Sequence, residues 1–179
     1  MRSKITTKQL VQIAVIAALY AALTALFMAV SFTALQLRVS EVLMFLAYFN
    51  PLAGIGLTLG CFIANLLMSP MPMYDCIFGT LATLMSVVAI SLTAKAFKGN
   101  KVGVLVASIW PVLFNGLIIG MMLCLAGIVP MDGTSKVVTI LSTMVSVGFG
   151  EMIVVTIMGV PLTYLIMAKY KKLITSFSL

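Results

Sequence analysis

Charged residues are rare in this chain and divide it into long apolar stretches. These stretches are 9–37, 42–74, 76–94, 102–131 and 137–168, the last interrupted only by Glu151. A helix crosses the hydrocarbon core of a membrane in about 20 residues. The first and the last three stretches therefore each predict one membrane-spanning helix.

The second stretch is too long for one helix and too short for two ordinary ones. It contains Asn50-Pro51, where proline removes a hydrogen bond and disfavours helix at the preceding residue. We predict a short helix followed by a full one, and thus an all-α integral membrane protein with six transmembrane helices in a single domain, 1–179. The predicted spans lie near 9–31, 39–49, 51–68, 73–95, 102–127 and 137–168.

The distribution of basic residues predicts the orientation in the membrane. Cytoplasmic loops carry an excess of Lys and Arg. With six spans and both the N-terminus and the C-terminus cytoplasmic, only Arg38 and Lys136 lie outside. The basic residues placed inside are Arg2, Lys4, Lys8, Lys95, Lys98, Lys101, Lys169, Lys171 and Lys172. A five-span chain would place residues 95–101 outside, against the rule.

Composition agrees with a lipid environment and excludes several classes of protein. Hydrophobic residues make up 63% and charged residues 8% of the chain, whereas a soluble domain carries about 25% charged residues. The net charge of +7 comes from the loops between apolar stretches, so we do not expect nucleic-acid binding. Without histidine, the three isolated cysteines give no zinc motif, and we interpret them as small apolar fillers.

Two polar residues are predicted to lie deep in the membrane. Glu151 is near the middle of the last stretch and Asn115 near the middle of the fourth. An ionised carboxylate at that depth costs about 2.5–3.5 kcal/mol, so it marks a functional site by default. A protonated glutamate bonded to a neighbouring helix is the alternative for Glu151. Trp110 offers a flat surface near Asn115, or packs in the core.

Further polar residues are predicted near the outer ends of the helices. Their shared placement, outside the deeper Glu151 and Asn115, predicts a funnel that opens outward. Each residue alone also fits an ordinary membrane interface, for example as a solvated ion pair. The set comprises Arg38, Glu41, Asn65, Tyr74 and Asp75.

Small residues form two ridges along the first predicted helix. In lipid, helices associate where small side chains let their backbones approach closely. The ridges therefore predict either internal packing or a docking face for another membrane subunit. One ridge is Ala14, Ala18 and Ala22, and the other is Ala17, Ala21, Ala25 and Ala29.

Several motifs resemble the QueT family of queuosine-precursor transporters, which are substrate-binding (S) components of energy-coupling-factor (ECF) importers. The most specific is Leu37-Arg-Val-Ser-Glu-Val-Leu43, followed by Phe49-Asn-Pro51. The others are Gly56-Leu-Thr-Leu-Gly-Cys-Phe-Ile-Ala-Asn-Leu66, Tyr74-Asp-Cys-Ile-Phe-Gly-Thr-Leu-Ala-Thr83, Trp110-Pro-Val-Leu-Phe-Asn115 and Gly148-Phe-Gly-Glu151.

The resemblance implies a protein of the bacterial cell membrane that binds a 7-deazaguanine-type precursor or queuine. It implies a transmembrane T subunit and two ATPase subunits as partners, which use ATP, while this chain binds no cofactor. The chain has no Gly-x-x-x-x-Gly-Lys-Ser/Thr phosphate loop of its own. The alanine ridges would be the face that docks on the T subunit.

The chemistry of a deazaguanine fits the candidate residues. Its ring N–H and exocyclic amine suit one carboxylate, for which we expect Glu151. Its carbonyl and remaining nitrogens suit Arg38, Asn65 and Asn115, and its ring suits an aromatic wall. A second carboxylate, Glu41 or Asp75, would suit a cationic aminomethyl group.

Other functions remain open from the sequence. A stand-alone proton-coupled carrier would also use a buried glutamate, although no inverted repeat is visible. An S component for another vitamin-like heterocycle is a further alternative. A membrane hydrolase built on histidine is excluded by the absence of that residue.

Overall fold

The computed structural model describes residues 5–33, 35–129 and 135–169, and it contains no strand in those ranges. The predicted all-α fold is therefore confirmed for the described part of the chain. The α-helices are α1 (Thr7–Leu26), α2 (Met28–Ser31), α3 (Leu46–Phe49), α4 (Ala53–Met68), α5 (Pro72–Tyr74), α6 (Thr80–Ala96), α7 (Lys101–Ala107), α8 (Ile109–Leu125), α9 (Lys136–Glu151) and α10 (Val160–Lys169). A 3-10 helix, η1 (Val39–Phe45), and two π-helical segments, η2 (Asp75–Gly79) and η3 (Met152–Gly159), complete the list.

Continuous helical segments match the six predicted ranges. Those long and apolar enough to cross a membrane are Thr7–Leu26, Pro72–Ala96, Lys101–Leu125 and Lys136–Lys169, while Val39–Phe49 and Ala53–Met68 are shorter. Large apolar side chains cover the outside, as a lipid-facing surface requires. The chain is thus a helical membrane protein, and the number of complete crossings stays a prediction.

Glycines bring neighbouring helices into close contact. A Cβ on Gly60 of α4 would lie 2.7 Å from the carbonyl oxygen of Ala17 on α1, and one on Gly120 of α8 would lie 2.5 Å from the Cα of Met144 on α9. Without these side chains the helix backbones approach closely, which is the main source of helix association in lipid.

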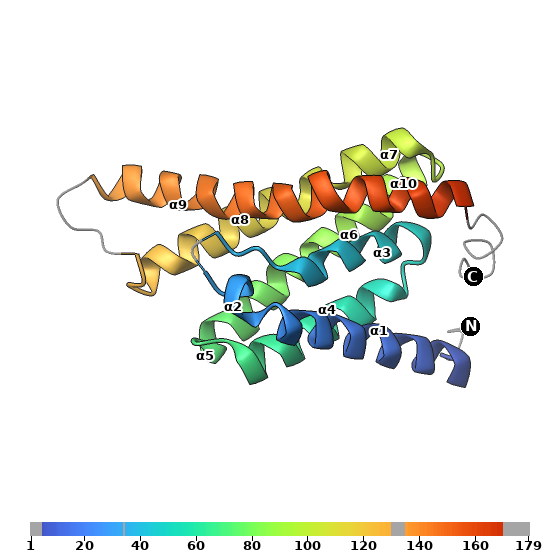
Figure 1. Ribbon diagram of the computed structural model, residues 1–179, viewed down its shortest axis with the longest axis horizontal. Coiled ribbons are helices and arrows are strands. Elements are labelled where there is room, and N and C mark those ends of the chain that lie inside the picture. The colour runs from blue at the N-terminus through green and yellow to red at the C-terminus, as the bar shows by residue number, and fades with distance from the viewer. Residues whose placement is uncertain (1–4, 34, 130–134, 170–179) are drawn as a thin grey trace.

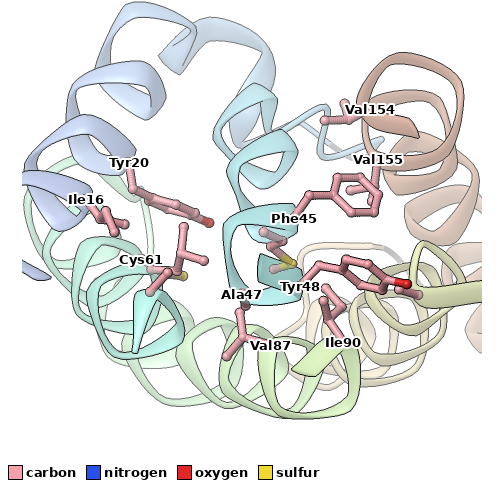
Figure 2. Packing of buried hydrophobic residues seen from close by; sticks show 14 of the residues in the cluster. Ile16, Tyr20, Phe45, Ala47, Tyr48, Cys61, Val87, Ile90, Val154 and Val155 are labelled. Atoms are coloured by element: carbon pink, nitrogen blue, oxygen red, sulfur yellow. The ribbon is translucent and has the colours of Figure 1, made fainter. Parts of the chain in front are cut away.

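The short segment η1–α3 lies in the centre of the molecule, between α1 and the long helix α9–η3–α10 (Figure 1). Figure 2 shows Phe45 beside Val155 on one side of the segment, with Tyr20 and Cys61 on the other. The segment ends where predicted, because Asn50 Oδ1 accepts the N–H of Leu52 at 3.0 Å and holds a turn.

Most of the basic residues of the described chain gather at one end of the bundle. Tyr48 donates a hydrogen bond to the carbonyl of Asn100 at 2.7 Å, and Tyr164 donates one to that of Lys101 at 2.8 Å. The turn between α6 and α7 therefore lies beside the end of α10. The start of α1 is at this same end (Figure 1). The first helix therefore begins, and the last helix ends, on one side of the bundle, as an even number of crossings requires.

This basic end comprises Lys8, Lys95, Lys98, Lys101 and Lys169. Arg2, Lys4, Asp132, Lys171 and Lys172 lie outside the described residues. Arg38 lies within the molecule and Lys136 begins α9 at the opposite end. Lys and Arg favour the cytoplasmic side, so we keep the prediction that the basic end is cytoplasmic.

We predict that a membrane-impermeant maleimide labels Ser135→Cys, but not Lys101→Cys, in intact cells. Both positions are exposed and lie at opposite ends of the bundle. The background should carry Cys76→Ser, since the other two cysteines are buried. Permeabilised cells, in which both variants react, provide the control. Labelling of Lys101→Cys in intact cells would contradict the orientation.

Candidate functional site

Five of the residues singled out from the sequence are buried inside the bundle. Their side chains are between 0% and 3% exposed, although each is charged or carries an amide. They come from the segment before η1, from η1 itself, and from α4, η2 and α9. This central cluster consists of Arg38, Glu41, Asn65, Asp75 and Glu151.

Arg38 is held by a sulfur atom and an aromatic ring. Its Nη1 donates to Cys61 Sγ at 3.6 Å, and its guanidinium lies 5.3 Å from the ring centre of Phe32. Its Nε and Nη2 are buried without a hydrogen-bond partner. Neighbouring Gly79 leaves room for Asn65, because a Cβ there would lie 2.8 Å from Asn65 Nδ2 but at an ordinary 3.8 Å from Arg38 Nη1.

Glu41 is tied to helix α1. Tyr20 donates a short hydrogen bond to Glu41 Oε1, while Oε2 has no partner. One turn later on α1, the hydroxyl of Thr24 lies 2.8 Å from that of Ser40. The side of α1 that faces the core therefore holds η1 in place.

Asp75 begins the π-helical segment η2. Ser69 donates a short hydrogen bond to Asp75 Oδ2, and Asn65 Nδ2 donates to the Asp75 carbonyl at 2.8 Å. Asp75 Oδ1 and Asn65 Oδ1 are buried without partners. Single π turns within helices frequently mark functional sites, and a carboxylate stands at the start of this one.

Glu151 ends α9 and directly precedes the second π-helical segment, η3. Its Oε1 is buried without a partner, and its carboxyl group interacts electrostatically with Glu41 and Arg38. The preceding Gly150 lies against the carbonyl of Leu35, so the segment leading to Arg38 crosses α9 at this point. The predicted site residues Arg38, Glu41 and Glu151 thus lie together.

Asn115 lies at nearly the same depth as Glu151. Gly116 of α8 packs against Gly148 of α9, and these helices run in opposite directions. Asn115 and Glu151 are therefore offset by about two residues, or roughly 3 Å along the axis. The Nδ2 of Asn115 is buried without a partner.

Besides Asn115, two predicted residues are not part of the cluster. Trp110 donates to Thr93 Oγ1 at 2.8 Å and stacks on Phe114 at 5.9 Å. Thr83 of α6 donates to Cys61 Sγ beside Arg38, and Thr93 lies ten residues further on, about 15 Å along the helix. Tyr74 is 39% exposed. Trp110 is thus a packing residue near the basic end, because its indole N–H finds a partner there.

A small cavity approaches the cluster from the end opposite the lysines. Its volume is about 140 Å³, and its walls include Phe32, Asp75 and Leu123. This position agrees with the outward funnel expected from the sequence. That the cavity opens to the outer side of the membrane stays a prediction.

The sequence did not identify the neutral side chains that form hydrogen bonds in and around the central cluster. Tyr20 and Thr83 sit in apolar helices, where nothing distinguishes them from packing residues. The interpretation of Cys61 as an apolar filler is wrong, because its sulfur accepts three hydrogen bonds. Its spacing of four residues from Asn65 on one helix is the signal that could have indicated a shared role.

The structure separates the two alanine ridges of α1. Ala14, Ala18 and Ala22 are exposed, as are Ala25 and Ala29 at the end of the second ridge. Ala17 is buried against Gly60, and Ala21 packs partly against the core. The docking interpretation is therefore wrong for Ala17, which serves internal packing, and an exposed ridge remains along the helix.

Comparison with known proteins gives a consistent assignment. A model of the QueT transporter family matches residues 10–168. The queuosine precursor transporter QueT of Lactococcus lactis subsp. cremoris (strain MG1363) is 43% identical over 83 residues, which cover 45% of this chain and 48% of that protein. The match thus spans about half the length of that relative. No solved structure matches the chain.

We predict that Gly150→Ala destabilises the protein by about 1–3 kcal/mol, the usual effect of overpacking. The new Cβ would collide with the Leu35 carbonyl, which cannot move without shifting the segment that leads to Arg38. Gly148→Ala is the matched control, because its nearest contact would be an ordinary 3.4 Å. Thermal unfolding in detergent measures both. Equal melting temperatures would show that residues 35–38 do not cross α9 here.

Proposed function

The chain belongs to the QueT transporter family, and from this premise we propose that it binds a queuosine precursor outside the cell and delivers it inward as the S component of an ECF importer. The observation that carries the proposal is the central cluster, whose charged groups are buried with unpartnered atoms inside an apolar bundle. Such groups are costly to hold in a membrane. A polar solute that pairs with them offsets this cost.

The unpartnered atoms supply the contacts that a deazaguanine requires. Glu151 accepts the ring N–H and the exocyclic amine, and the free edge of Arg38 donates to the carbonyl. Asn65, within the cluster, and Asn115, at nearly the same depth as Glu151, each offer a further unpartnered amide atom. Phe32, next to Arg38, takes the place of Trp110 as the proposed aromatic surface.

A cationic substituent on the solute would find a carboxylate in this site. Asp75 is the better placed of the two candidates, because it borders the cavity that opens to the end away from the lysines. Each carboxylate already accepts one short hydrogen bond, Asp75 from Ser69 and Glu41 from Tyr20, so the position beside the cavity decides between them. An aminomethyl group therefore points toward Asp75 in the proposed binding mode.

Transport in this proposal depends on other subunits. The chain binds no cofactor; a transmembrane T subunit and two ATPase subunits in the bacterial cell membrane supply the energy of ATP hydrolysis. The exposed alanines of α1 form the proposed docking face, because small side chains let a partner helix approach closely. Uptake by the purified chain alone, driven by a proton gradient, would favour a stand-alone carrier instead.

Equilibrium binding to the purified chain tests the solute assignment. We expect 7-deazaguanine to bind, and riboflavin and biotin not to bind. Guanine presents the same two donors to Glu151 and differs from 7-deazaguanine at position 7. It is therefore expected to bind more weakly only if the protein contacts position 7. Tight binding of riboflavin or biotin in place of 7-deazaguanine would contradict the assignment.

In the same assay, we predict that Glu151→Gln lowers the affinity for 7-deazaguanine by about ten- to a hundredfold. A charge-assisted hydrogen bond contributes about 1.5–3 kcal/mol, and each 1.4 kcal/mol is about tenfold in affinity. The glutamine also turns a donor toward the donors of the solute. Tyr74→Phe, at an exposed position outside the cluster, is the matched control. A Glu151→Gln protein that binds as tightly as the parent would remove Glu151 from the site.

We predict that Ala18→Trp abolishes uptake in vesicles that contain all subunits, while binding of 7-deazaguanine to the isolated chain is retained. Ala18 is exposed on the docking face, and a bulky side chain there blocks the approach of a partner helix. Val145→Trp, at an α9 position where the native valine is 71% exposed, controls for a large lipid-facing residue. Loss of solute binding in Ala18→Trp would assign this ridge to internal structure.

A further inference from the structure

Cys61 lies at the meeting point of three polar side chains. Its sulfur accepts hydrogen bonds from Thr83 Oγ1 at 3.2 Å, from Asn65 Nδ2 at 3.4 Å and from Arg38 Nη1 at 3.6 Å. The side chain is fully buried. Sulfur is a weak acceptor, so a thiol that collects three donors, one of them a guanidinium, has a role other than filling space.

The contact with Cys61 decides which edge of Arg38 stays available. It occupies Nη1 and leaves Nε and Nη2 buried without partners. The N–H groups of Nε and Nη2 run parallel along one side of the guanidinium and form a fork that suits oxygen acceptors. The ring of Phe32 further restrains the guanidinium. Arg38 therefore presents a fixed pair of donors.

Two carboxylates lie close to Arg38 but do not accept its hydrogen bonds. Glu41 and Asp75 both interact electrostatically with the guanidinium, and each has a free oxygen. Arg38 nevertheless donates to neither of them in the described structure; its hydrogen-bond partner is the neutral sulfur. A direct ion pair would consume the donors of Arg38 together with the acceptors of one carboxylate.

We propose that Cys61 is a positioning residue for solute binding: its sulfur anchors Nη1 of Arg38, so that the Nε/Nη2 fork remains open to a carbonyl of the solute. This inference rests on the proposed function and extends it to a residue that does not itself contact the solute. Preorganisation of this kind raises affinity because fewer side chains must be ordered on binding.

The test compares replacements of Cys61 with and without an acceptor. We expect Cys61→Ala and Cys61→Val to lower the affinity for 7-deazaguanine about tenfold, the loss of one charge-assisted contact. Cys61→Ser keeps an acceptor and should stay within about threefold of the parent. Agreement between alanine and valine excludes a cavity as the cause. Cys124→Ala is the control, because Cys124 is equally buried but, within the described residues, its thiol hydrogen-bonds only to the Thr139 carbonyl, at 3.9 Å.

A double-mutant cycle shows whether Cys61 acts through Arg38. Lysine lacks the fork, so adding Cys61→Ala to Arg38→Lys should cost no further affinity. A full tenfold loss in that background, or a Cys61→Ala protein that binds like Cys124→Ala, would overturn the inference while the proposed function stands. A parent protein that does not bind 7-deazaguanine would overturn both.

Discussion

The burial of the Arg38 guanidinium is the constraint on which the central cluster depends. A cation in a lipid-embedded bundle needs compensating charge and hydrogen bonds. Here the compensation comes from the sulfur of Cys61, the ring of Phe32 and the fields of Glu41 and Asp75. Glycines 79 and 150 provide the space, since side chains there would meet Asn65 and the Leu35 carbonyl. The result is a set of charged groups that are close together yet incompletely paired.

Helix α1 connects this cluster with the outer surface of the protein. Tyr20 and Thr24 bind Glu41 and Ser40 on its inner side, and Ala18 and Ala22 are exposed on its outer side. The helix proposed to meet a partner subunit therefore also forms one wall of the proposed solute site. Any displacement of α1 changes the hydrogen bond available to Glu41.

The fold and the charged residues of the candidate site could be predicted because a few residues, the charges and the prolines, stand out in an apolar chain. Charges in an apolar chain are costly, so Glu151 and Arg38 stand out, and Asn50-Pro51 identifies the break between the second and third segments. These features are local in the sequence and follow directly from the chemistry of lipid and of the peptide bond.

The remaining features depend on how each helix is rotated in the bundle. Ala17 and Ala18 are adjacent alanines, and only packing against Gly60 decides that the first is buried and the second exposed. Likewise, Trp110 finds its partner in Thr93, and Cys61 gains a polar role from Arg38, which lies 23 residues away in the chain. Apart from the four-residue spacing of Cys61 and Asn65 on one helix, neutral side chains in these apolar helices carry no pattern that reveals such contacts.

A structure determined with bound 7-deazaguanine would show whether the central cluster holds the solute. The decisive quantities are the distances from the solute to Arg38 and Glu151. We expect the solute carbonyl about 2.7–3.2 Å from Nε or Nη2 of Arg38, with the ring N–H and exocyclic amine of the solute directed at Glu151. A solute that binds elsewhere, with Arg38 still held only by Cys61 and Phe32, would show that the cluster serves structure and not transport.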